Sequence, residues 1–147
     1  MTKVLVLHGP NLNLLGEREP EVYGSEGLES IDRRLKEEGK KLGLEVRTLQ
    51  SNHEGVLIDA IHEARGWAEA LIVNPGGLTH TSISLRDAIA SVRLPAVEVH
   101  LTNIFAREAF RRRSITAGAC RGVIAGFGPA GYLMALRSVV EILHAEG

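Results

Sequence analysis

The 147-residue sequence is poor in several features, and each shortage excludes a class of protein. Its single cysteine, Cys120, allows neither an internal disulfide nor a multi-cysteine metal cage, and it suits a reducing cytoplasm. Aromatic residues make up only 4%, too few for a stacking platform that binds single-stranded nucleic acid. The net charge of −1 gives no general attraction to nucleic acid or to anionic membranes.

Signals for export, membrane insertion and nucleotide binding are also missing. The N-terminus has no signal-peptide pattern, and no apolar run approaches the ~20 residues of a membrane span. There is no P-loop, no Gly-x-Gly-x-x-Gly after a strand, and no HExxH or clustered Cys/His ligand set. None of the four lysines lies where a Schiff base could form in the predicted site. We therefore expect a cytoplasmic protein without metal or cofactor that binds neither nucleic acid nor membrane.

What the sequence does contain is a regular alternation of apolar, strand-like runs and amphipathic, helix-like segments. With 44% hydrophobic and 24% charged residues, the chain suits a single domain, residues 1–147, with a sizeable core. Five such units predict a flavodoxin-like, doubly wound α/β fold of five parallel strands with helices on both faces, rather than an eight-stranded barrel. The predicted strands are 3–8, 45–50, 69–74, 96–101 and 121–126, and the predicted helices are 27–43, 54–66, 82–92, 104–112 and 130–145.

Ligands of open α/β sheets bind beyond the carboxyl ends of the strands, where the strand order switches. The segment after the first predicted strand, residues 9–26, is too long for a routine connection and is typical of a lid. Its Asn11 could bind a ligand oxygen or could only form a turn after Pro10. Arg18 and Tyr23 would each be an ordinary surface residue alone. They matter as a pair, because a tyrosine is a poor base near neutral pH unless cations stabilise the tyrosinate.

Two further strand exits carry polar side chains. Asn74 and His80 flank two glycines that permit close backbone approach to a ligand, although a glycine turn and a helix cap would explain part of this segment. Glu98 and His100 are two residues apart on one strand and therefore share a face. A carboxylate that holds an imidazole raises its pKa and orients it as a general acid, but a structural ion pair explains the two residues equally well.

Charged residues also lie on the predicted helices that follow these exits. Arg107 and Arg111 are four residues apart, so they would lie on one side of their helix. Asp87 follows Arg86 on the preceding helix, where a surface ion pair is the simplest interpretation.

Five segments, taken together, form a specific set. They are Gly-Pro-Asn-Leu-Asn-Leu-Leu-Gly continuing to Tyr-Gly (9–24), Asn-Pro-Gly-Gly-Leu-Thr-His-Thr-Ser (74–82), Arg-Asp-Ala (86–88), Glu-Val-His-Leu-Thr-Asn (98–103) and Ala-Arg-Glu-Ala-Phe-Arg (106–111). In order, spacing and total length, this set resembles the type II 3-dehydroquinases, from Val4 to about Arg137. The chain departs from the common family pattern at Arg113 and at residues 115–117, where we expect effects on local packing or subunit contacts rather than on the chemistry.

The resemblance implies a hydro-lyase that converts 3-dehydroquinate to 3-dehydroshikimate by anti elimination through an enolate, in aromatic amino-acid biosynthesis or in quinate breakdown. It implies that Tyr23 takes a proton from C2, with Arg18 lowering its pKa and Arg107 as a second cation nearby. Asn11 would position a water on the enolate oxygen. His100, oriented by Glu98, would protonate the departing hydroxyl.

The resemblance further implies substrate contacts and an assembly of identical subunits. Asn74, with Leu101 and Thr102, would hold the carboxylate, and His80 with Arg111 would hold the ring hydroxyls. Asp87 would reach in from a neighbouring subunit of a homo-dodecamer built from four trimers.

Two other classes of function fit the sequence less well. A flavodoxin-like binding module or regulator could keep the fold without turnover, but a receiver-type regulator would need acidic residues where His8 and Asn74 stand. A nucleotide-binding protein is disfavoured by the missing phosphate loop.

Overall fold

The molecule is built around one sheet of five parallel strands. A computed structural model describes residues 1–17, 19–23 and 25–146, apart from the side chains of Pro20 and Tyr23. The strands are β1 (Thr2–His8), β2 (Leu44–Gln50), β3 (Ala70–Asn74), β4 (Ala96–His100) and β5 (Gly122–Ala125), in the spatial order β2-β1-β3-β4-β5. This is the flavodoxin-like order, so the predicted fold class is confirmed.

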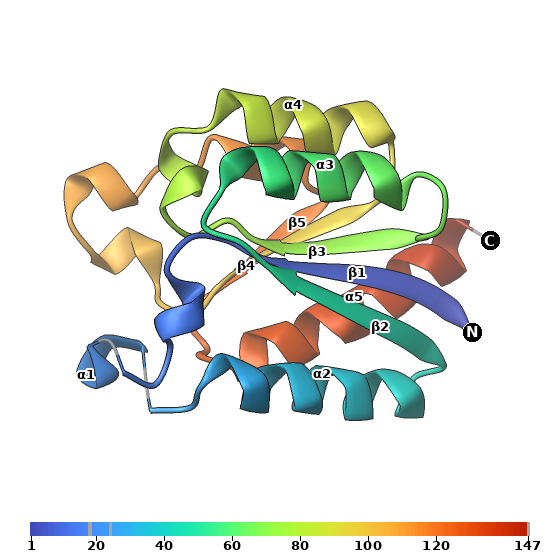
Figure 1. The fold of residues 1–147 in the computed structure, drawn as a ribbon, viewed down its shortest axis with the longest axis horizontal. Helices are drawn as coiled ribbons and strands as arrows, with labels where there is room; N and C mark the ends of the chain where they lie inside the picture. The colour runs from blue at the N-terminus through green and yellow to red at the C-terminus, as the bar shows by residue number, and fades with distance from the viewer. Residues whose placement is uncertain (18, 24, 147) are drawn as a thin grey trace.

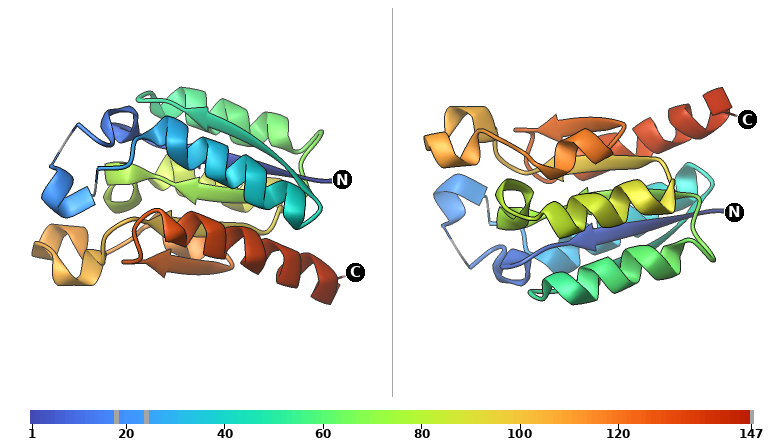
Figure 2. Two further views of the ribbon diagram at one scale, coloured as in Figure 1. Left: turned by 90° about the horizontal axis from the view of Figure 1, so that it is seen from below. Right: turned by 90° about the horizontal axis from the view of Figure 1, so that it is seen from above.

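Helices cover both faces of the sheet, as the alternation predicted. Helices α2 (Leu28–Lys41) and α5 (Ala130–Glu146) lie side by side on one face, and α3 (Glu54–Ala64) and α4 (Ile83–Val92) lie on the other (Figures 1 and 2). The remaining helical pieces are α1 (Pro20–Tyr23) and five 3-10 turns: η1 (Leu12–Leu14), η2 (Gly76–His80), η3 (Ile104–Ala106), η4 (Ala109–Arg111) and η5 (Thr116–Ala119).

The core consists of two apolar layers, one on each face of the sheet. Successive side chains of a strand point to opposite faces. In β1, Val4 and Val6 therefore join the layer under α2 and α5, whereas Leu5 and Leu7 join the layer under α3 and α4. Both faces are apolar, and this explains why the central strands read as continuous hydrophobic runs.

One predicted element is wrong, because residues 104–112 do not form a continuous helix. They form the two separate turns η3 and η4. Arg107, between them, is extended (φ −101°, ψ −166°), and Glu108 is also non-helical (φ −57°, ψ 150°). Phe105 and Phe110 are more than 60% exposed, so this segment has no buried apolar stripe that would hold a helix on the core.

After β1 the chain forms β2 on one side of the sheet, and after β3 it forms β4 on the other side. The switch in strand order therefore falls between β1 and β3. Here the exits of the two strands touch. A Cβ at Gly9 would lie 2.4 Å from the carbonyl oxygen of Pro75, and one at Gly76 would lie 2.9 Å from that of Pro10. Only glycines permit this approach, so the two loops form one unit. Within the described residues, no helix combines the length and apolar character needed to cross a membrane.

Candidate active site

A pocket opens beyond the carboxyl ends of β1, β3 and β4, at the edge that the topology predicted. Figure 1 shows this edge on the left, where the loop after β1 and the turns after β4 project from the sheet. Seven of the predicted site residues line it, together with Arg107 and the glycines Gly76 and Gly77. The lining residues are Pro10, Asn11, Leu12, Asn74, Gly76, Gly77, His80, His100, Leu101, Thr102, Ile104, Arg107 and Arg111.

The strongest polar pair at the pocket is His100 with Glu98, both on β4. His100 Nε2 lies 2.7 Å from Glu98 Oε2, and the two side chains are 6% and 0% exposed. Because a carboxylate can only accept, the ring donates through Nε2. Nδ1 has no partner among the described residues, and His100 lines the pocket. Nδ1 is thus left to face a ligand from the pocket wall, a geometry that suits a general acid when the ring is doubly protonated.

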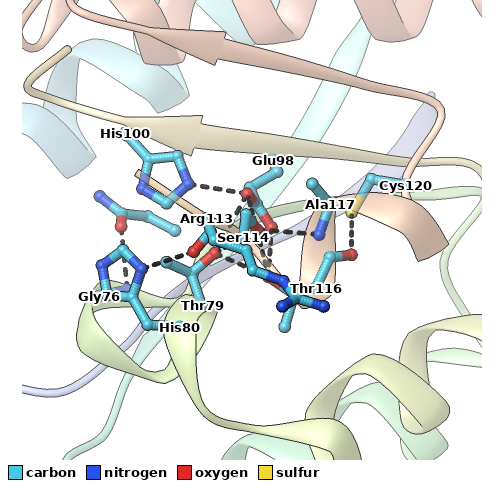
Figure 3. A network of polar contacts seen from close by, with 11 residues as sticks. Gly76, Thr79, His80, Glu98, His100, Arg113, Ser114, Thr116, Ala117 and Cys120 are labelled. Atoms are coloured by element: carbon cyan, nitrogen blue, oxygen red, sulfur yellow. Dashed lines mark hydrogen bonds and ion pairs between the residues drawn. The ribbon is translucent and has the colours of Figure 1, made fainter. Parts of the chain in front are cut away.

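Three hydroxyls complete the surroundings of Glu98 (Figure 3). Ser114 Oγ lies 2.8 Å and Thr79 Oγ1 3.2 Å from Oε2, and Thr116 donates to Oε1. These residues come from η2, from the loop after η4 and from the start of η5. The carboxylate therefore receives hydrogen bonds from three separate segments of the chain besides His100. We call this set of hydroxyls the Glu98 cage.

The cage keeps a fully buried carboxylate charged. Burial is the largest single influence and raises the pKa of Glu98, because it removes the charge from water. The hydrogen bonds from His100, Thr116 and Ser114, with the positive charge on His100, act the other way and together outweigh burial. The pKa of Glu98 is consequently held below its ordinary value, so the imidazole has an anionic partner at neutral pH.

Asn11 lines the pocket from the loop after β1. Its backbone is left-handed (φ 70°), a conformation that asparagine adopts more readily than most residues. Its N–H donates to Asn52 Oδ1 at 2.9 Å, and Gln50 Nε2 donates to the same oxygen at 3.1 Å. The turn interpretation and the ligand-contact interpretation of Asn11 are therefore compatible. The backbone forms the turn, and the residue lines the pocket.

His80 and Asn74 present polar atoms from the β3 exit. His80 Nδ1 donates to the carbonyl oxygen of Arg113 at 2.7 Å, which leaves Nε2 for a ligand. Asn74 is 4% exposed, and its Oδ1 accepts from the N–H of Gly76 at 3.2 Å. Its Nδ2 donates to Tyr132 Oη at 3.0 Å.

Two arginines supply positive charge, although not from one helix face as predicted. Arg107 and Arg111 both line the pocket, and Glu108 lies between them. Arg111 Nε donates to Glu108 Oε2 at 2.7 Å, and Arg107 Nε lies 3.8 Å from Oε1. The hydrogen bond from Arg111, the largest influence, lowers the pKa of Glu108. Separate turns, rather than helical periodicity, bring the two guanidinium groups together.

Four predicted residues are not among those that line the pocket, and one of them is Glu98, which is bonded to His100. Arg18 lies outside the described residues, and Tyr23 is described only through its backbone, at the end of α1. Asp87 is exposed on α4, outside the lining of this pocket. Its neighbour Arg86 is not a simple surface ion-pair partner, because it donates to the carbonyl oxygen of Ile115 at 2.7 Å.

Sequence reasoning missed the cage and a second buried histidine. His8, at the end of β1, is 0% exposed and contacts Asp32 and Tyr132. A histidine that ends an apolar strand was the available signal. The departure from the family pattern at Thr116 was expected to affect local packing or subunit contacts, yet its hydroxyl contacts Glu98. Among the described residues, no three His, Cys, Asp or Glu side chains are grouped so as to hold a metal ion.

The fold and the pocket together define an α/β protein whose candidate site groups a histidine–carboxylate pair with amides and arginines. The model of the family Dehydroquinase class II matches residues 2–140, and the chain belongs to that family. It is 57% identical to the 3-dehydroquinate dehydratase of Ruegeria pomeroyi over 147 residues, covering 100% of this chain and 99% of that one.

Two solved structures share the fold over nearly the whole chain. The type II dehydroquinase from Propionibacterium acnes superposes with a TM-score of 0.93 at 38% identity, covering 96% of this chain and 97% of that one. The enzyme of the same type from Butyrivibrio crossotus gives a TM-score of 0.92 at 44% identity, covering 94% and 97%.

Proposed function

We propose that this protein dehydrates 3-dehydroquinate to 3-dehydroshikimate, in the shikimate pathway of aromatic amino-acid biosynthesis or in quinate breakdown. The observation that carries the proposal is the Glu98–His100 pair, which opens on a pocket lined by amides and arginines. The reaction is an anti elimination. A proton leaves C2, an enolate forms at the adjacent ketone, and the C1 hydroxyl departs as water. No metal, cofactor or covalent lysine is required.

His100 is the general acid of this proposal. Hydroxide is a poor leaving group, so it must receive a proton as the C1–O bond breaks. The proton comes from Nδ1, while Nε2 stays bonded to Glu98, whose lowered pKa keeps the carboxylate anionic. Glu98 therefore orients the ring and stabilises its charged form.

Tyr23 is the proposed base, acting as a tyrosinate. Arg18 and Arg107 would lower its pKa through their positive charge. Asn11 would hold a water on the enolate oxygen, because the proton beside a ketone is acidic enough only when that oxygen is stabilised. Support for this half of the site comes from the position of Asn11 and Arg107 in the lining of the pocket.

The remaining contacts bind the substrate. We assign the carboxylate to Asn74, to backbone N–H groups near Leu101 and to the Thr102 hydroxyl. The ring hydroxyls are assigned to His80 Nε2 and Arg111. All five residues line the pocket, and hydrogen-bond donors predominate among them, as an anionic ligand requires.

We also propose a single-domain, cytoplasmic subunit that assembles into a dodecamer of four trimers, in which Asp87 reaches a neighbouring pocket. Exposed apolar side chains around the edge strand β5 support an assembly: Phe105, Val123, Phe127 and Met134 line one surface groove. Native mass spectrometry would test it, with twelve times the 15.9 kDa chain mass as the expected result.

The decisive experiment is an assay of the purified protein with 3-dehydroquinate alone, following the ultraviolet absorbance of the enone product. Turnover that survives EDTA and borohydride, and collapses in Tyr23→Phe, is the expected result. Absence of turnover in a folded oligomer would refute the enzyme assignment and leave a binding module as the better interpretation.

A further inference from the structure

A chain of four buried or half-buried polar groups runs from helix α2, through the core, to Asn74 at the pocket. Asp32 Oδ1 lies 2.7 Å from His8 Nε2, His8 Nδ1 lies 2.8 Å from Tyr132 Oη, and Asn74 Nδ2 lies 3.0 Å from the same Oη. His8 and Tyr132 are 0% exposed, and the Asp32 side chain is 26% exposed. None of the proposed chemical steps uses the first three of these residues.

The direction of every hydrogen bond in this chain follows from its two ends. The N–H of Gly76 can only donate, so the atom of Asn74 that faces it is Oδ1 and the atom that faces Tyr132 is Nδ2. The Tyr132 hydroxyl thus accepts from Asn74. Its own hydrogen has one acceptor among the described residues, His8 Nδ1. His8 consequently carries its hydrogen on Nε2 and donates it to Asp32.

The opposite arrangement would leave a buried group unmatched. A hydrogen on His8 Nδ1 would have to be donated to Tyr132, and the phenolic hydrogen would then lack an acceptor within the described part of the core. Such a group loses its hydration without compensation, which costs far more than an ordinary hydrogen bond gains. Burial raises the pKa of Tyr132, so the phenol stays protonated and can only fill this place as a hydroxyl.

We propose that Tyr132, held by His8 and Asp32, is a positioning residue that fixes the amide of Asn74 with an N–H directed at the substrate carboxylate. One hydrogen of Asn74 Nδ2 is taken by Tyr132, and the other has no acceptor among the described residues. Since Asn74 lines the pocket, that second hydrogen is the donor offered to a ligand. The inference rests on the proposed function only in naming a carboxylate as the acceptor.

A fixed donor at this position also selects among ligands. A free asparagine amide can rotate to present either its oxygen or its nitrogen, so it accepts donors and acceptors alike. Here rotation would break the bonds to both Gly76 and Tyr132. The hydrogen-bonded series therefore makes this part of the pocket favour ligands with anionic or acceptor oxygens. It disfavours donor groups, because a donor would face an N–H.

A kinetic double-mutant cycle tests the proposal. Asn74→Ala and Tyr132→Phe are each expected to raise KM about tenfold or more, with a much smaller change in kcat, since one positioned donor to a charged group is lost. The double variant should match Asn74→Ala alone, because Tyr132 acts only through Asn74. Effects that multiply, or a KM that does not change in Tyr132→Phe, would overturn the proposal.

Controls separate positioning from a general loss of stability. Ser138→Ala removes a different hydroxyl from α5, one that donates to the carbonyl oxygen of Met134, and should leave KM unchanged. Asp32→Ala changes the partly exposed end of the hydrogen-bonded series, away from the pocket. It should raise KM about threefold, while Asp32→Asn, which keeps an acceptor oxygen, should stay within about twofold of the unchanged protein.

A measurement without substrate distinguishes failure of this inference from failure of the proposed function. Nitrogen-15 NMR of the histidine-labelled protein should show His8 as the neutral form with its hydrogen on Nε2. A hydrogen on Nδ1 would reverse the chain and refute the inference even if turnover is normal. The expected tautomer together with the expected cycle would establish it, and a protein without turnover would still be judged by the tautomer.

Discussion

His100 and His8 are each the last residue of a parallel strand, each buried, and each bonded through Nε2 to a carboxylate at 2.7 Å. They differ in what the other ring nitrogen meets. Nδ1 of His8 faces Tyr132 in the core, whereas Nδ1 of His100 belongs to the pocket wall. In our proposals, the pair whose second nitrogen is left to the pocket is the proton donor. The pair with both nitrogens engaged is proposed to position Asn74 through Tyr132.

The two carboxylates, Glu98 and Asp32, also differ in burial and in the number of their hydrogen bonds. Glu98 is fully buried and receives three hydroxyl hydrogen bonds besides that of His100, while Asp32 is partly exposed on α2. Water can compensate for changes at Asp32, but only protein groups can do so at Glu98. Substitutions in the Glu98–His100 pair should therefore have the larger effect. We expect them to lower kcat, whereas substitutions in the Asp32–His8 pair should raise KM.

The largest expected difference comes from replacing the two histidines. His100→Asn should lower kcat by about 10²–10⁴-fold, the range for loss of a general acid. His8→Asn should lower kcat less than about tenfold and raise KM, although it also leaves a buried polar site imperfectly matched. Steady-state kinetics with folded protein, checked by circular dichroism, measures both. Equal losses of kcat would remove the distinction between the two pairs.

Neutralising the two carboxylates should give a smaller contrast in the same direction. Glu98→Gln keeps the shape but removes the charge opposite His100. We expect kcat to fall about 10–100-fold, because a hydrogen bond to a charged partner becomes a neutral one. Asp32→Asn is the matched variant and should change kcat less than about twofold. A comparable loss in Asp32→Asn would mean that both carboxylates serve the chemistry.

Stability against acid should depend on Glu98 in a defined pH window. The folded-state pKa of Glu98 lies below the ordinary value of 4.5, so the unfolded chain binds the proton first. The stabilisation from this group is complete above that value and is lost as pH falls through the folded-state pKa. Urea denaturation from about pH 6 to pH 3 should show a steeper decline for the unchanged protein than for Glu98→Gln. Parallel declines would show that the cage does not lower this pKa.

The smallest effect should come from one hydroxyl of the cage. Thr116→Val keeps the volume but removes a donor to Glu98, which raises the pKa of the carboxyl group. We expect kcat to fall about fivefold, the equivalent of one ordinary hydrogen bond. Thr116→Ser retains the hydroxyl and should recover most of the loss. If valine and serine behave alike, the residue contributes only packing.

The sequence allowed prediction of the sheet and of most helices because their signals are local. Apolar runs, and alternation in residues 45–50, marked the five strands, and the carboxyl-end rule then located the pocket without any knowledge of side-chain contacts. The segment 104–112 was predicted wrongly as a helix. Its charges are spaced as on a helix, but Phe105 and Phe110 face solvent, and a helix without a buried face has little to stabilise it.

The contacts that support the pocket could not be predicted, because they join distant parts of the chain. Glu98 was identified, but Thr79 and Thr116 are 19 and 18 residues away from it, and hydroxyls carry no distinctive pattern. His8 and Tyr132 are separated by 124 residues. Only the folded geometry shows that His100 faces the pocket and that His8 faces a phenol.

The close approach of Gly9 to Pro75 and of Gly76 to Pro10 has a practical consequence for anyone who redesigns this pocket. Neither loop has room for a single added methyl group at these positions. Asn11 and Asn74 are therefore held by one pair of interlocked loops, and we expect a backbone change in either loop to displace both amides. Libraries of variants should keep the two glycines fixed and diversify the turns after β4, where exposed side chains leave space for change.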